Sequence, residues 1–161
     1  STFYGCSKLT TAPVIPNSVT SMASAFSGCK SLTTAPAIPN SVTDMESTFN
    51  GCISLKTATI PLTKMGVNPN NGQDFPAYYQ NTLYNTPALN VTWEGERTVS
   101  FNVTTLGGTR TQEDIQELVP EHLADLTSQG KTATLTLGET CLAYLTEDEI
   151  AGAVAKGWTI Q

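Results

Sequence analysis

Charged side chains are scarce in this chain of 161 residues, and positive charge is the scarcest. Only 14% of the residues are charged, and 8 Lys and Arg against 14 Asp and Glu give a net charge of −6. Binding of a nucleic acid needs clustered cations, and the chain contains no basic run. The composition therefore argues against a nucleic-acid partner.

Long apolar runs are also missing. A membrane-spanning helix needs about 18 or more apolar residues in succession, and no stretch of this sequence approaches that length. No segment has the features of a signal peptide. We therefore expect no insertion of this chain into a membrane.

Residues that carry catalysis are few. Histidine occurs once, as His122, and the chain offers it no obvious partners for a catalytic triad or a histidine-ligated metal. Gly107 and Gly108 lack the flanking pattern of a phosphate-binding loop. Glu94 and Glu96 are neighbours in a turn, which gives no indication that their carboxylates face each other. We predict no catalytic residue, no cofactor and no metal site.

The sequence does contain a regular repeat, seen first in the equal spacing of Phe3, Phe26 and Phe49. A fixed period of about 20–50 residues indicates a solenoid, in which each coil buries its apolar face against its neighbours. Because Ser1 falls inside a unit, we expect further coils, and any export signal, ahead of it. The same spacing separates Cys6, Cys29 and Cys52, and also Leu9, Leu32 and Leu55.

Each unit is predicted to contain short strands, a turn and one helical turn. The L-T-T-A and V-T-x-M segments are rich in β-branched residues, which suit strands. The I-P-N-S segments at 15–18 and 38–41 are predicted turns, because proline fixes φ and Asn and Ser bond to their own backbone. The S-x-F-x-G-C segment is interpreted as one helical turn, closed by Gly28 or Gly51.

The repeated cysteines are interpreted as a column of buried free thiols, which is the usual state of free cysteine. Neighbouring coils could bring two of Cys6, Cys29 and Cys52 within bridging distance, but three equivalent cysteines cannot pair evenly. A metal site is disfavoured because the C-x-x-C spacing is absent. Cys141 is given the same interpretation as the other three.

The third unit is irregular and carries an insertion around 66–77. After it, residues 81–89 match residues 47–55 in their apolar positions, with Leu83 in place of Phe49. The offset between Phe49 and Leu83 is one period plus an 11-residue insert. We therefore expect the coil to continue beyond a loop that is pushed out of it.

The pattern changes from Asn90 onward. Alternation over 99–103 predicts a strand with one buried face. A helix is expected to begin after the N-cap Thr111, to kink or split at Pro120 and to end at Gly130. The remaining predicted elements are a strand over 132–137, a helix from the capping box at Thr146–Glu149 to Gly157, and a strand over 158–160.

The ordered motif L-T-T-A-P-x-I-P-N-S-V-T-x-M-x-S-x-F-x-G-C resembles the BspA-like leucine-rich repeats of bacterial surface proteins. The match covers residues 1–62 strongly and 77–89 weakly. The tail, on residues 135–138, 145–147 and 155–160, resembles a C-terminal segment of repeat proteins from gut bacteria and of tail-associated proteins of their phages. The resemblance implies a leucine-rich-repeat solenoid that binds proteins or glycans and is no enzyme, and it fixes no ligand residue.

We therefore predict an α/β solenoid of 23-residue coils over 1–92, closed by a strand-helix-strand-helix-strand cap over 93–161. The expected function is recognition or adhesion, with a protein or a glycan on a cell or matrix surface as the partner. A structural spacer, or an accessory domain of a larger surface or phage tail protein, is the alternative. The expected location is extracellular or on the cell surface, with a virion tail as the alternative.

The first candidate ligand surface is a ladder of outward-facing polar residues on the repeats, and the second is an aromatic loop after the insertion. Polar strand faces are also the default for any solvated sheet, so the ladder has a purely structural alternative. The ladder comprises Thr10, Thr11, Thr33, Thr34, Lys56 and Thr57, and the loop contributes Tyr78, Tyr79 and Tyr84.

Overall fold

The repeats stack through backbone hydrogen bonds that recur at equivalent positions of successive units. The computed structural model describes residues 1–87 and 89–161. Phe3 N–H donates to the carbonyl of Ala25 at 2.9 Å, and Phe26 N–H donates to the carbonyl of Thr48 at 3.0 Å. The rings of Phe3 and Phe26 stack at a centroid distance of 5.2 Å, and those of Phe26 and Phe49 at 5.8 Å. The repeated phenylalanine therefore forms a column at the centre of the stack.

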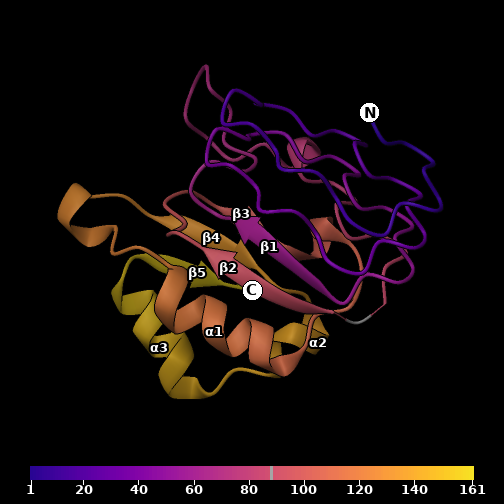
Figure 1. Ribbon diagram of the computed structural model, residues 1–161. Coiled ribbons are helices and arrows are strands. Elements are labelled where there is room, and N and C mark those ends of the chain that lie inside the picture. Colours follow the sequence, from indigo (N-terminus) through magenta and orange to yellow (C-terminus); the bar gives the residue numbers. More distant parts are fainter. Residues whose placement is uncertain (88) are drawn as a thin grey trace.

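The expected strands and helical turns of the first two units are not formed. Residues 1–56 contain only isolated parallel bridges, such as Ser21 with Asp44, and run as loops in Figure 1. Ser24 and Ser47 have φ angles of 54° and 52°, which a right-handed helical turn cannot include. The S-x-F-x-G-C segment is therefore a succession of tight turns.

The backbone hydrogen bonds between units continue after the insertion, with a longer offset along the chain. Gly28 N–H donates to Asn50 O within the regular repeat, whereas Gly51 N–H donates to Tyr84 O, on the far side of the insertion. The second bond reaches further along the chain than the first by the length of the 11-residue insert. Asn81 takes the positive φ of Ser24 and Ser47 at its equivalent position. Ala88, which belongs to the matched segment, lies outside the described residues.

The insertion is a short excursion that begins beside Gly66. An antiparallel bridge joins Val67 to Asp74, and Phe75 N–H returns to the carbonyl of Gly66 at 2.7 Å. Gly66 is buried with a φ of 69°, and a Cβ atom there would overlap the ring of Tyr79. The insertion thus depends on a glycine for both its backbone conformation and its close approach to the core.

Gly66→Ala is expected to destabilise the fold by several kcal/mol, because left-handed strain costs about 1–2 kcal/mol and the overlap with Tyr79 adds to it. Gly72→Ala is the matched control, since Gly72 has a φ of 68° but open space around it. Chemical denaturation of both variants measures the difference. Equal losses at the two positions would show that the approach of Tyr79 to Gly66 is not as close as described.

The regular elements form two small parallel sheets. Strand β1 (Thr57–Pro61) pairs with β2 (Asn90–Glu94), and β3 (Phe101–Asn102), β4 (Ala133–Thr136) and β5 (Trp158–Ile160) form the second sheet in that order. Helices α1 (Gln112–His122) and α3 (Glu147–Ala155) lie on one side of the strands, opposite the repeats (Figure 1). The short elements are α2 (Glu139–Leu142) and the 3-10 turns Pro76–Tyr78, Val103–Leu106 and Thr127–Gln129.

Helix caps in the tail follow the sequence prediction. Thr111 and Thr146 are the N-caps of α1 and α3, and each is part of a full capping box. Pro120 lies inside α1, which ends two residues later at His122 rather than continuing to Gly130. This early end agrees with the hydrogen bond that proline removes from a helix interior. Strand β2 and helix α2 are elements that the sequence prediction lacked.

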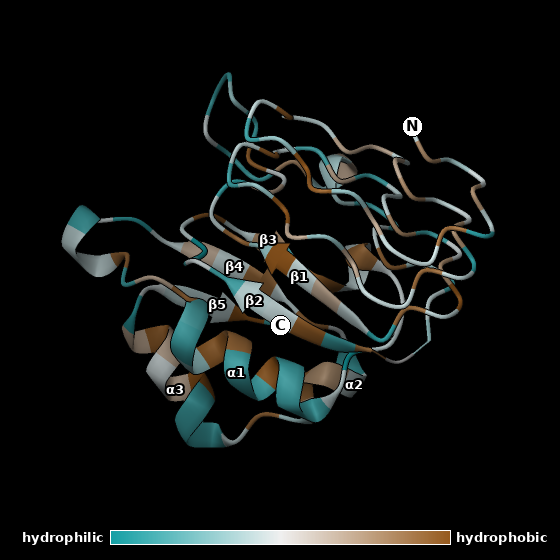
Figure 2. Ribbon diagram, viewed as in Figure 1, coloured by the Kyte–Doolittle hydropathy of each residue, from teal (hydrophilic) through white to brown (hydrophobic). Residues whose placement is uncertain are grey.

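The core is continuous from the repeats into the tail. Helix α1 packs against β2 and α3, and α3 packs against β5. Trp93 on β2 donates its indole N–H to the carbonyl of Asp114 at 2.7 Å, and Trp158 on β5 donates to Ala124 O at 2.9 Å. Figure 2 shows mainly hydrophilic colour on the exposed side of α1. The apolar faces of the helices therefore complete the core that begins at the repeated phenylalanines.

Candidate functional site

The polar ladder is exposed, and its central part is built by successive backbone bonds. Lys56 N–H donates to Thr33 O at 2.9 Å, and Asn90 N–H donates to Lys56 O at 3.1 Å. Thr34 and Thr57 form a parallel bridge next to them. All six predicted ladder residues are exposed, but among residues 1–87 and 89–161 no backbone hydrogen bond joins Thr10 or Thr11 to the second unit.

Asn90 extends this ladder and was missed by the sequence prediction. The offset that aligns Leu83 with Phe49 also aligns Asn90 with Lys56, so the signal was present in the repeat. The three side chains of Thr33, Lys56 and Asn90 contribute to the wall of a groove of about 550 Å³. Ile53, which is 59% exposed, lies in the same groove. Hydroxyl, ammonium, amide and apolar groups therefore meet on one surface.

The three predicted aromatic residues do not form one surface. Tyr78 is half-buried and packs edge-on against Phe75, with ring centroids 4.7 Å apart. Tyr84 is 50% exposed and lies beside Gly107. Tyr79 is fully buried, because the offset across the insertion aligns it with the core residue Met45. Tyr79 therefore serves the interior, and only Tyr78 and Tyr84 offer surface to a ligand.

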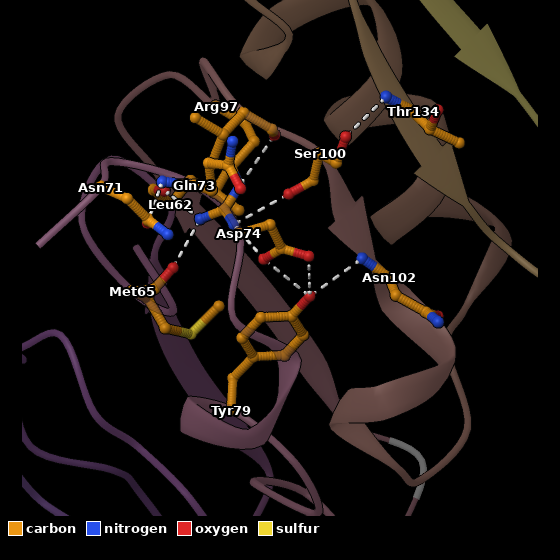
Figure 3. Close-up of polar contacts among 11 residues, drawn as sticks. Leu62, Met65, Asn71, Gln73, Asp74, Tyr79, Arg97, Ser100, Asn102 and Thr134 are labelled. Carbon is orange, nitrogen blue, oxygen red and sulfur yellow. Dashed lines mark hydrogen bonds and ion pairs between the residues drawn. The ribbon is translucent and has the colours of Figure 1, made fainter. Parts of the chain in front are cut away.

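Tyr79 belongs to a buried polar cluster with Asp74 and Arg97 (Figure 3). Its hydroxyl lies 3.0 Å from both carboxylate oxygens of Asp74 and accepts a bond from the backbone N–H of Asn102 at 3.1 Å. Arg97 donates to Asp74 at 2.8 Å. Burial raises the pKa of Tyr79 and keeps the phenol protonated, so that it can donate to the carboxylate.

Arg97 joins the repeats, the insertion and the tail. Its side chain is fully buried, and its nitrogens donate to four backbone carbonyls besides Asp74. The guanidinium carbon lies 5.0 Å from the ring centre of Phe101. Burial lowers the pKa of Arg97, and the charge of Asp74 opposes that shift. The four carbonyls are those of Leu62, Met65, Val99 and Ser100. Because every nitrogen of Arg97 donates a hydrogen bond, we interpret the cluster as a structural brace.

The repeated cysteines lie where the repeat places them, with one exception. Cys29 and Cys52 are buried free thiols, as predicted, and their Sγ atoms donate to Phe3 O and Phe26 O at 3.2 and 3.1 Å. Cys6 is exposed, because no coil of the described chain covers the first unit. Cys141 is only half-buried. Burial raises the pKa of the Cys52 thiol to about 12.

Stability is expected to fall as pH rises from about 9 towards 12. The unfolded chain loses the Cys52 proton near its ordinary pKa of 9.0 while the folded chain keeps it up to about 12. The unfolded state then binds fewer protons, which lowers the free energy of unfolding as pH rises. One proton corresponds to about 1.4 kcal/mol per pH unit. Denaturation of Cys52→Ser, which keeps a donor for Phe26, should show a shallower decline; an identical slope would contradict the assignment.

Groups that could suggest catalysis have structural partners. His122 Nδ1 lies 2.8 Å from the carbonyl of Gly95, and its Nε2 lies 3.5 Å from Glu117. Within residues 1–87 and 89–161, no three His, Cys, Asp or Glu side chains gather in a way that could hold a metal ion. In the same residues, no helix has both the length and the apolar character needed to span a membrane.

Part of the chain matches a known family. Residues 1–70 match the family model described as BspA type Leucine rich repeat region (6 copies). Repeats of this type are generally non-catalytic and typically surface-associated, and no catalytic family matches the chain. No curated protein and no solved structure matches it. Residues 1–70 of this chain therefore form a BspA-type leucine-rich repeat region.

Proposed function

We propose that this chain is a non-enzymatic recognition module that binds a protein or glycan ligand through the groove lined by Thr33, Lys56 and Asn90. The observation that carries the proposal is that ladder side chains from successive coils line one hollow of about 550 Å³. Exposed hydroxyl, amide and ammonium groups offer hydrogen bonds to hydroxyl and carbonyl groups. Binding surfaces of repeat proteins arise in the same way, from equivalent positions on stacked units.

The architecture that we propose for this function is a leucine-rich-repeat solenoid over 1–92 and an α/β cap over 93–161. The inter-coil bonds and the phenylalanine column support the solenoid. The cap is supported by the pairing of β1 with β2, since β2 covers the strand edge that the last repeat would otherwise expose. Strand β2 (Asn90–Glu94) spans the proposed boundary, so the two parts are expected to unfold together.

We further propose that the module acts on the outside of a cell, where it adheres to a cell or matrix surface, or on a virion tail. The sparse charge and the abundance of Thr, Ser and Asn suit hydrogen bonding to neutral polar ligands. The exposed Tyr84 and the half-buried Tyr78 form a secondary contact candidate on the same stack. A spacer role, in which the repeats only set a distance, is the competing account.

A binding screen tests the proposal. Labelled chain is applied to bacterial cells, host matrix proteins and a glycan array, beside a variant in which Thr33, Thr34 and Lys56 are changed to Glu. The proposal predicts saturable binding that this variant loses by at least about tenfold, because two or more hydrogen bonds are lost and each is worth roughly 1 kcal/mol.

A matched control variant carries the same change of net charge at a surface outside the groove. In it, the exposed residues Thr127, Ser128 and Lys131 of the tail are changed to Glu, and binding should be retained. Equal loss in both variants would point to a general charge effect and contradict the groove. Absence of binding to every surface tested would favour the spacer.

A further inference from the structure

A second polar feature lies in the tail, well separated in sequence from the repeats. Arg110 is only 4% exposed. None of the described residues places a hydrogen-bond partner at its Nε, Nη1 or Nη2 atom. The chain has two arginines, and the other, Arg97, is bonded at every nitrogen. Arg110 is thus a buried cation whose five donors are unused.

An unpaired buried charge is expensive, with an effective cost of several kcal/mol. Burial lowers the pKa of Arg110, and the charge of Asp114 opposes this shift with a smaller effect. Both carboxylate oxygens of Asp114 already accept backbone bonds, from Val91 at 3.0 Å and from Thr111 at 3.2 Å. Asp114 therefore stabilises strand β2 and the start of α1, and it does not pair directly with the guanidinium.

Arg110 forms part of the wall of a pocket of about 250 Å³ at the start of α2. The exposed side chains of Thr104, Glu139 and Thr140 lie around this pocket. Gly108 lies close to the guanidinium, since a Cβ atom there would come within 3.1 Å of Nη2. The pocket is large enough for a small planar group, and its outer wall belongs to a helix of only four residues.

We infer that this pocket binds a carboxylate group, which pairs with the guanidinium of Arg110. A planar guanidinium matches a carboxylate in a two-bond arrangement, and the threonine hydroxyls at the mouth can donate to the same oxygens. The nitrogens of Arg110 are covered, so binding requires the side chains that cover them to move.

The surrounding charge selects a monoanion. Glu139 lines the pocket, and the charge of Asp114 also acts on Arg110. A phosphate dianion would add two negative charges to a site with one cation and two carboxylates, whereas a carboxylate adds one. Two sources carry this chemistry: the carboxylate of an acidic sugar and the C-terminus of a peptide.

The two arginines provide a direct test by NMR of their Nε–Hε groups in the ¹⁵N-labelled full chain. Sodium acetate is titrated at constant ionic strength, with sodium chloride making up the balance. The inference predicts a saturable shift of the Arg110 signal, with the Arg97 signal unchanged. A shift that does not saturate, equal movement of both signals, or saturation by phosphate at a lower concentration than acetate would overturn it.

Variants and a second readout complete the test. Acetate should raise the thermal midpoint of the wild type, and Arg110→Lys should require about tenfold more acetate for the same rise, because an ammonium lacks the two-bond geometry. Arg110→Met should show no rise, and a rise equal to that of the wild type would place the site elsewhere. Glucuronate and N-acetylalanine, compared in the wild type, then distinguish an acidic sugar from a peptide C-terminus as the natural source.

Discussion

Replacing Arg97 with Met is expected to lower the free energy of unfolding by about 3–5 kcal/mol, the range found when one partner of a buried ion pair is removed. Methionine fills similar space but donates no hydrogen bond. The carboxylate of Asp74, whose side chain is 13% exposed, would lose its cation. Four backbone carbonyls from the repeats and the tail would lose their donor at the same time.

Urea denaturation of Arg97→Met measures this loss, and Lys131→Met is its control. Lys131 is an exposed cation in the wall of a groove of about 790 Å³ that Asp74 also lines, and its replacement should change stability by no more than about 0.5 kcal/mol. If Arg97→Met lowered the free energy of unfolding by less than about 1 kcal/mol, the hydrogen bonds of Arg97 to Asp74 and the four carbonyls would not be formed in solution.

Phe49→Ala is expected to cost about 3–5 kcal/mol, the usual range for removing a buried phenyl ring. Phe49 is fully buried, and its ring stacks on that of Phe26. Phe3→Ala is the matched comparison, since Phe3 occupies the same repeat position but is only half-buried. Its cost should be about 1–2 kcal/mol, in proportion to the apolar area that it covers.

Thermal and urea unfolding of the two variants give the comparison. We expect the larger loss of stability at Phe49 because an inner ring of the column is covered by a neighbouring unit on each side. The first ring, that of Phe3, is covered on one side only. Equal costs would contradict that arrangement, and a larger cost at Phe3 would mean that the first unit is covered in solution by part of another molecule.

The sequence was most informative where the repeat was intact. The regular period predicted the columns of Phe3 and Cys29, and the offset between Phe49 and Leu83 predicted how the stack resumes after the insertion. Capping boxes at Thr111 and Thr146 were predictable because their hydrogen bonds are local. These features depend on spacing or on neighbouring residues, both of which a single sequence displays.

Other features depend on contacts that are distant in sequence. The helical turns expected in the first units did not form, because Ser24 and Ser47 adopt positive φ angles, and the expected strands are reduced to isolated bridges. Tyr79, which was predicted as a ligand contact, is buried because it is equivalent to the core residue Met45 across the insertion. The bonds of Arg97 to Leu62 and Asp74 cross 35 and 23 residues, and no local pattern marks them.

The polar ladder and the groove of the proposed ligand surface both require that the repeats continue as a single stack across the insertion. The groove joins Thr33 and Lys56, which precede the insertion, to Asn90, which follows it. If the stack stopped at the insertion, Asn90 would not extend the ladder, and the proposed ligand surface would lose one wall.

Amide hydrogen exchange tests this claim most directly. Met45, Ser47, Phe49 and Gly51 donate to carbonyls that follow the insertion, and the account predicts that their amides exchange as slowly as those of Met22, Ser24, Phe26 and Gly28, which donate within the regular repeat. Rapid exchange confined to the first group, with the second group still protected, would contradict a continuous stack.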